Sequence, residues 1–388
     1  MIACAYCRKE NKDAAQRCWE CGTEFSAPAT PPPATPFQPP PLPKTTLINI
    51  DGIEAWLHFE SGFHRADWKA IRHWIESNIS PLDVGRAWNE AALLWVQKLR
   101  EDLGGDYFIL VSSQTILLCD QSGETAQWLL DYSGRIARTI KERLDRIAWQ
   151  GASGKDIILV FSDQDDYYQY LSIHSPDGEQ AASGGMCIDS GYTHVAFPWQ
   201  DELAAANVIV HELTHDCLAH LPMPLWLNEG IAVTLEKNIG PPTVPAWHGA
   251  HAALNSALIN WQPPMMWDEL AEKHHSFWTA ENIQSFWAGT SFFEPGDASQ
   301  LSYSLAEVLV KLLLEKSEGS AFQAFIETAS HSDAGQTAAL DILHADLGDI
   351  AGTFLGEGSW RPQRRAMVSC WDAAGWNDTT TEESVNPQ

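Results

Sequence analysis

The sequence VIVHELTHDCLAHLPMPLWLNEG, residues 208–230, decides the fold that we predict for this chain. Its apolar residues predict a largely buried helix, which Pro222 ends. Pro224 is well placed in the first turn of a second helix, because that position needs no backbone N–H. The two helices are therefore expected to lie close together, joined by a short turn.

Two histidines and two glutamates of this stretch predict a metal centre. His211 and His215 are four residues apart, so on a helix their imidazoles project from one face and can bind one metal ion. Glu212 lies beside them and can accept a proton, and Glu229 in the second helix is the predicted third ligand. Three protein ligands leave one position for water, which is the pattern of catalytic zinc, whereas structural zinc sites have four protein ligands.

His220 is an alternative third ligand, five residues after His215. The metzincin pattern, however, requires a glycine three residues after the second histidine and another histidine six residues after it. Leu218 and Leu221 occupy those positions, so we interpret His220 as a residue at the helix end, where the helix dipole favours it. The other alternative is a buried helix whose histidines only form hydrogen bonds.

HELTH followed by WLNEG resembles the gluzincin metallopeptidases, which include thermolysin-like and aminopeptidase-like enzymes, and looks most like the small bacterial peptidase MA-like domains. The resemblance is specific at these two helices and diffuse over residues 106–356. It implies that His211, His215 and Glu229 bind zinc and that Glu212 is the general base.

Two positions near the motif add to this comparison. In many relatives an acidic residue four positions after the glutamate ligand supports a histidine ligand, but Val233 occupies that position here. We expect Asp216 or Glu236 to take its place. Tyr303 is the only tyrosine after Glu229. In several gluzincins a downstream tyrosine or histidine donates a hydrogen bond to the oxyanion, which implies this role for Tyr303, and the alternative is a packed aromatic side chain.

The N-terminal residues 1–25 contain a second predicted zinc site. Two Cys-x-x-Cys pairs, ten residues apart, can close a tetrahedral site with the four ligands Cys4, Cys7, Cys18 and Cys21. The alternative is a pair of redox or disulfide cysteines. Because the segment has no basic face, we expect a structural role or docking to a partner protein, and no binding to nucleic acid.

The rest of the chain predicts an α+β fold with a small mixed sheet and a helical bundle. Its strand–helix–strand–hairpin order before the motif helix resembles the catalytic half of zincins, which implies a zincin-like metallopeptidase domain, preceded by the zinc ribbon. A proline-rich linker (26–46) leads to a helical part (47–105), the zincin-like domain (106–358) and a polar tail (359–388). Periodicity predicts strands at 107–111, 115–119 and 157–161, a hairpin of 186–188 with 193–197, and helices at 66–77, 84–103, 125–149, 163–171, 248–259, 267–275, 301–316, 321–329 and 337–346. In zincins the edge strand beside the motif helix binds the substrate main chain, and the resemblance implies this role for 193–197, with His194 expected at the surface.

Composition narrows the possible functions. The 388 residues include 51 acidic and 24 basic side chains, a formal net charge of -27, which disfavours binding to nucleic acid or to an anionic membrane. Neither a secretory signal nor a run of ~18 apolar residues is present, so we predict a cytoplasmic protein without a membrane span. In that reducing compartment, eight cysteines favour metal binding over disulfides.

Together these patterns predict a zinc-dependent peptidase that hydrolyses a peptide or protein substrate, with one catalytic and one structural Zn²⁺. The alternative is non-catalytic, a zinc-bearing scaffold or protein-binding module on a zincin fold. Glu212 favours the enzyme, because a site that only binds zinc does not need this carboxylate.

Overall fold

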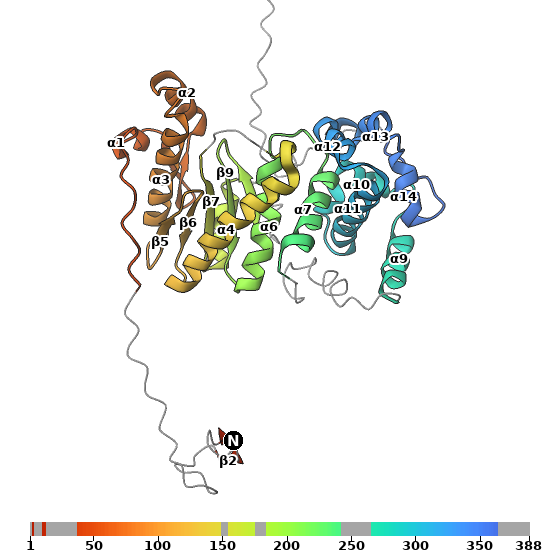
Figure 1. The fold of residues 1–388 in the computed structure, drawn as a ribbon, viewed down its shortest axis with the longest axis horizontal. Helices are drawn as coiled ribbons and strands as arrows, with labels where there is room; N and C mark the ends of the chain where they lie inside the picture. The colour runs from red at the N-terminus through yellow and green to blue at the C-terminus, as the bar shows by residue number, and fades with distance from the viewer. Residues whose placement is uncertain are drawn as a thin grey trace, which may run out of the picture. The chain divides into compact units, whose positions relative to one another are not determined.

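The computed structural model describes residues 2–3, 10–12, 37–148, 154–174, 184–241 and 265–363 (Figure 1). The chain divides into two compact units, Met1–Gln38 and Pro39–Gln388. In the first unit, β1 (Ile2–Ala3) pairs antiparallel with β2 (Glu10–Asn11). The four predicted ribbon ligands, Cys4, Cys7, Cys18 and Cys21, lie outside the described residues.

A five-stranded mixed sheet is the centre of the second unit. Its strands are β5 (Phe108–Val111), β6 (Thr115–Cys119), β7 (Asp156–Phe161), β8 (Met186–Asp189) and β9 (Thr193–Pro198), in the order β5-β6-β7-β9-β8. The inner strands β6, β7 and β9 are mutually parallel, and β5 and β8 run antiparallel at the two edges. This mixture of helix and sheet, with the predicted strands and hairpin, confirms the α+β expectation at the level of fold class.

The prediction that residues 193–197 form the edge strand is wrong. The strand β9 pairs on one side with β7 and on the other with β8, so β8 is the edge. The run Val195–Phe197 is buried on both faces, as is usual for an inner parallel strand. The surface position predicted for His194 is also wrong: only 1% of the residue is exposed, and its ring faces the aromatic core beneath the sheet.

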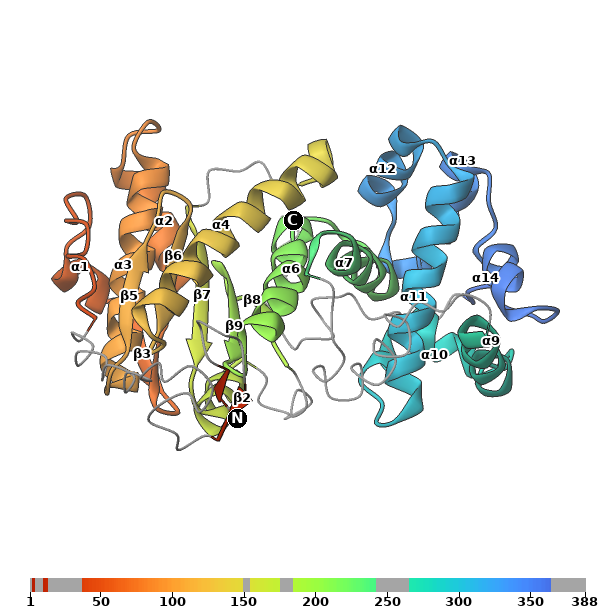
Figure 2. The same cartoon turned by 60° about the horizontal axis from the view of Figure 1, so that its bottom comes forward.

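Helices cover both faces of the sheet (Figures 1 and 2). On one face lie α2 (Trp68–Asn78), α3 (Val84–Leu103) and α5 (Gln164–Ser172), and on the other α4 (Gly123–Leu144) and α6 (Glu202–Leu218). The strands supply both cores by alternation: in β7, Ile157 and Leu159 face α3, whereas Ile158 and Val160 face α6. The helical segment predicted over 47–105 therefore shares its core with the sheet.

A short segment fastens the start of the second unit to this scaffold. Before α1 (Ile50–Glu54), the backbone N–H groups of Thr46, Leu47 and Ile48 donate to Glu90 Oε2 over 2.6–3.0 Å. A hairpin of β3 (Leu57–Glu60) and β4 (Phe63–Ala66) then leads into α2. Three charge-assisted hydrogen bonds to one carboxylate thus hold residues 46–48 on α3.

A group of helices follows α6 in the chain. It consists of α7 (Leu225–Ile239), α9 (Met265–Phe277), α10 (Ile283–Ala288), α11 (Asp297–Lys316), α12 (Gly319–Thr328), α13 (Gln336–Leu343) and α14 (Leu347–Leu355). The helix α7 packs between α6 and α11 (Figure 2). The helix predicted over 248–259 lies outside the described residues. Within the described ranges, no helix combines the length and apolar character needed to span a membrane.

Candidate metal centre

Helices α6 and α7 position the candidate metal centre. Asp201 caps the start of α6, where its side chain accepts a hydrogen bond from the Ala204 N–H at 2.9 Å. Pro224 directly precedes α7, so the turn after α6 brings the chain back beside the histidines. Both helices are buried around most of their circumference, which explains why a polar site between them is shielded from solvent.

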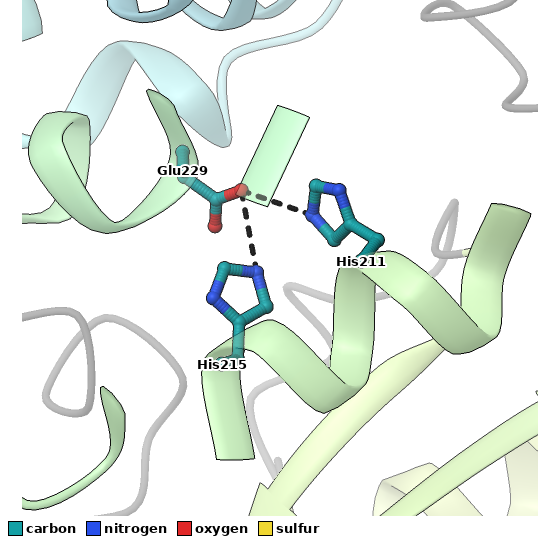
Figure 3. A group of neighbouring side chains, drawn as sticks. All are labelled: His211, His215 and Glu229. Carbon is teal, nitrogen blue, oxygen red and sulfur yellow. Dashed lines mark hydrogen bonds and ion pairs between the residues drawn. The ribbon is translucent and has the colours of Figure 1, made fainter. Parts of the chain in front are cut away.

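The predicted ligands converge. His211 and His215 project from α6 toward Glu229 on α7 (Figure 3). The Glu229 Oε2 atom lies 3.2 Å from His211 Nε2 and 3.5 Å from His215 Nε2. Among the described residues this is the one group of three histidine, cysteine or acidic side chains whose ligand atoms all lie within 4.8 Å of one another.

These donor atoms fit a zinc ion. Donors ~2.1 Å from a tetrahedral ion lie about 3.4 Å from one another, close to the two separations between Glu229 and the histidines. Two imidazole nitrogens and one carboxylate oxygen are also a usual protein donor set for catalytic zinc. The geometry therefore suits three-ligand zinc coordination.

A second carboxylate contacts Nδ1, the other ring nitrogen of His211. The Glu236 Oε2 atom lies 3.2 Å from His211 Nδ1, so an Nδ1–H can donate to it and leave the Nε2 lone pair for a metal. Burial acts to lower the pKa of His211, but the hydrogen bonds to Glu229 and Glu236, together with the negative charges of Glu212 and Glu229, outweigh it and hold the pKa well above its ordinary value. Burial likewise acts to raise the pKa of Glu229, yet His215 and His211 keep it well below its usual range.

The structure distinguishes the two predicted supporting residues. Glu236 contacts His211, whereas burial, together with the nearby Asp156 carboxylate, raises the pKa of Asp216 to about 8. Asp216 thus interacts electrostatically with the start of β7, and Glu236 takes the place that Val233 cannot fill. No hydrogen-bond partner of His215 Nδ1 is found within the described part of the chain.

Glu212 is buried between α6 and the sheet edge, with 8% of the residue exposed. Its Oε2 atom accepts a hydrogen bond from the backbone N–H of Cys187 in β8, over 2.7 Å. The sequence analysis missed this contact, because the donor is a backbone N–H, which does not depend on the type of residue. Burial does not distinguish the two strands either, because Met186–Ile188 of β8 is buried like Val195–Phe197 of β9.

Tyr303 lies on α11, where its ring packs edge-on against Phe292 with centroids 5.0 Å apart. Burial raises the pKa of Tyr303 well above its ordinary value, and the negative charges of Glu229 and Glu212 raise it further. The phenol is therefore close enough to the centre to interact electrostatically with both carboxylates. His220 is exposed at the end of α6 and is not a member of the group.

Neither a known family model nor a curated protein sequence matches this chain.

Proposed function

We propose that this chain is a zinc-dependent peptidase of the gluzincin type. The observation that carries the proposal is the convergence of His211, His215 and Glu229, with both Glu229–histidine separations close to those of a tetrahedral ion and Glu212 next to the first histidine. A buried carboxylate beside a three-ligand site is the arrangement that metal-assisted hydrolysis needs.

Zinc, Glu212 and Tyr303 have different roles in the proposed peptide hydrolysis. When bound, zinc would lower the pKa of a water molecule to ~7 and would polarise the scissile carbonyl. Glu212 accepts the proton of the attacking water and passes it to the leaving amine. Tyr303 donates a hydrogen bond to the oxyanion, for which its raised pKa keeps the phenol protonated.

We assign substrate binding to the edge strand β8, whose one partner strand among the described residues is β9. A peptide in extended conformation can add to such an edge through main-chain hydrogen bonds, using main-chain groups other than the Cys187 N–H, which donates to Glu212. In this proposal the substrate is a peptide or an unfolded segment of a protein, lying along β8 beside the metal centre.

We further propose a structural zinc ion for Cys4, Cys7, Cys18 and Cys21, with a partner protein docking on the ribbon. Paired cysteines suited to zinc favour a reducing compartment, and we propose the cytoplasm. These proposals rest on the sequence pattern.

Glu212→Gln tests the mechanism, because glutamine keeps the shape of the side chain and cannot accept the proton. We expect the variant to retain zinc and to lose hydrolysis by ~10²-fold or more. The assay is the digestion of a peptide library by the intact chain, with and without phenanthroline. Glu202→Gln is the matched control, because Glu202 is exposed in the first turn of the same helix and should be dispensable.

Three outcomes are informative. Loss of hydrolysis in Glu212→Gln alone, with zinc retained, supports the peptidase. A fully active Glu212→Gln variant contradicts the mechanism. A wild-type protein that holds zinc but cleaves no member of the library supports the scaffold instead.

A further inference from the structure

The general base is in contact with the edge of the sheet. The Cys187 N–H donates to Glu212 Oε2 over 2.7 Å, and 6% and 8% of these two residues are exposed. A backbone N–H that donates to a carboxylate within a buried site forms a short, charge-assisted hydrogen bond. This contact joins β8 to α6 at the residue on which the proposed chemistry depends.

Gly185 makes this close approach possible. A Cβ atom at Gly185 would lie 2.4 Å from Val208 Cγ1, 3.4 Å from Phe197 Cβ and 3.5 Å from Glu212 Oε1. Val208 is one helical turn before Glu212 on α6, and its branched side chain has little rotamer freedom in a helix. Gly185 is not among the glycines with positive φ, so alanine can adopt its backbone conformation. The need for glycine here is therefore one of space.

We propose that the main chain of residues 185–187 is a positioning element for the general base. The Cys187 N–H fixes Glu212 Oε2, which leaves Oε1 to accept the proton, and Gly185 supplies the space that this bond requires. A glutamate side chain has three rotatable bonds, and holding one oxygen restricts the carboxylate to a productive orientation. This inference rests on the proposed peptidase function and adds the group that orients its base.

The hydrogen bond can be tested directly, without any assay of hydrolysis. In the intact, zinc-loaded chain labelled with ¹⁵N at cysteine only, the spectrum contains at most eight backbone amide signals. The variant Cys187→Ala removes and thereby identifies the signal of Cys187. We expect this amide proton to be shifted downfield in the wild type and to move upfield in Glu212→Ala, which has no acceptor.

The space requirement is tested by a compensating pair. Gly185→Ala should move β8 away from α6, shift the Cys187 amide upfield, and lower kcat by ~10–10²-fold with KM and zinc content little changed. Val208→Ala removes the γ-methyl groups that a Cβ at position 185 would meet. The double variant Gly185→Ala/Val208→Ala should recover the amide shift and most of kcat, and Val208→Ala alone should resemble the wild type.

The outcomes separate the inference from the proposed function. The positioning role is overturned if the chemical shift of the Cys187 amide proton is the same in Glu212→Ala as in the wild type, or if Gly185→Ala has wild-type kcat. Either result leaves the peptidase proposal intact. An amide that responds as expected, in a wild-type protein that holds zinc and cleaves nothing, overturns the peptidase and the positioning role with it. If Gly185→Ala does not fold, Glu212→Ala and the double variant still decide the question.

Discussion

Two carboxylates of α7, Glu229 and Glu236, lie on either side of the His211 ring. The Glu229 Oε2 atom faces Nε2 and the Glu236 Oε2 atom faces Nδ1, each at 3.2 Å. A carboxylate behind a histidine ligand fixes its tautomer and raises its basicity as a donor. We therefore expect Glu236→Ala to weaken zinc affinity by about 10–100-fold. The zinc affinity of Glu236→Gln should lie between those of Glu236→Ala and the wild type, because the glutamine amide oxygen can still accept a hydrogen bond from His211 Nδ1–H.

Zinc affinity is measured by competition with a chromophoric chelator at fixed pH. Asp216→Asn is the matched control, since Asp216 was the other predicted support and is not seen to contact either histidine. An affinity that falls with Asp216→Asn and not with Glu236→Ala would contradict the assignment.

His194 makes stability depend on pH. The Tyr170 O–H donates to its Nε2 over 2.6 Å, and its Nδ1–H can donate to the Tyr192 carbonyl, so the neutral ring is satisfied in the core. Burial lowers the pKa of His194 to about 4, from an ordinary value of 6.5. Between these values the unfolded chain binds a proton that the folded chain does not, so stability falls as pH drops from 6.5 to 4.

We expect His194→Gln to remove this part of the acid sensitivity, because glutamine can accept from Tyr170 and does not titrate. Between pH 7 and pH 4 the wild type should lose up to ~3 kcal/mol more unfolding free energy than the variant. Urea unfolding at both pH values measures the difference, in which the contributions of groups that do not interact with His194 cancel. The His174 ring lies 5.7 Å away and its pKa is lowered by burial and also by His194, so the change in its contribution is included in the difference. Equal losses in the two proteins would show that His194 is protonated in the folded state.

At the scale of residues, spacing predicted which three side chains converge. His211, His215 and Glu229 converge because helical periodicity and a proline-limited turn are local properties of the chain. Glu236 could be named only as one of two possibilities, since the choice depends on how α6 and α7 are rotated against each other. The Cys187 N–H could not be predicted, because every non-proline residue carries the same group.

At the scale of elements, α7 and α11 approach so closely that one glycine decides their distance. A Cβ at Gly230 would lie 2.5 Å from the Ala306 carbonyl oxygen and 2.7 Å from Val310 Cγ2. The backbone of α11 cannot move aside locally, so the helices must separate. Because Gly230 follows Glu229 directly, the same contact sets the position of a proposed metal ligand relative to α11, which carries Tyr303.

We expect Gly230→Ala to lower the unfolding free energy by about 1–3 kcal/mol, the usual cost of overpacking. This occurs although alanine is the better helix former by ~1 kcal/mol. Gly319→Ala in α12 is the control, because no heavy atom lies within 4 Å of a Cβ at that position. Chemical denaturation compares the two variants, and a Gly230→Ala protein as stable as Gly319→Ala would show that the helices separate without cost.

The order of strands shows where prediction of elements stops. The hairpin of β8 and β9 follows from local alternation and turn residues, and the structure confirms it. Either strand of this hairpin could pair with β7, which lies more than thirty residues earlier than β9 in the chain. The choice depends on a long-range contact, in which Ile158 lies opposite Val195. Strands adjacent in sequence often pair, but here the chain passes through α5 and β8 before β9 returns to β7.

At the scale of the whole molecule, the Glu90 contact marks where the second unit begins. Thr46, Leu47 and Ile48 each donate a backbone N–H to its carboxylate, and Ile48 is buried in the core on the α3 side. A chain that starts at Pro39 keeps all three donors. A chain that starts at Asn49 leaves a buried carboxylate without them, which should cost ~2 kcal/mol or more of unfolding free energy.

This boundary allows the two proposed zinc ions to be counted separately. We expect two zinc ions in the full chain and one in the chain that starts at Pro39, because the four ribbon cysteines precede that residue. In the shorter chain, His215→Ala or Glu229→Ala should abolish the remaining zinc, since each removes one of three ligands. Metal analysis of dialysed, folded protein gives the counts.

The counts test each proposed site independently. In the full chain, replacing Cys4 and Cys7 by serine should leave one zinc ion and, if the first unit does not contribute to catalysis, unchanged hydrolysis. A folded Pro39 chain without zinc would contradict the metal centre, and with it the peptidase. One zinc ion in the full chain and one in the Pro39 chain would instead contradict only the proposed zinc site of the ribbon. The candidate centre between α6 and α7 would stand, because it is built entirely from residues of the second unit.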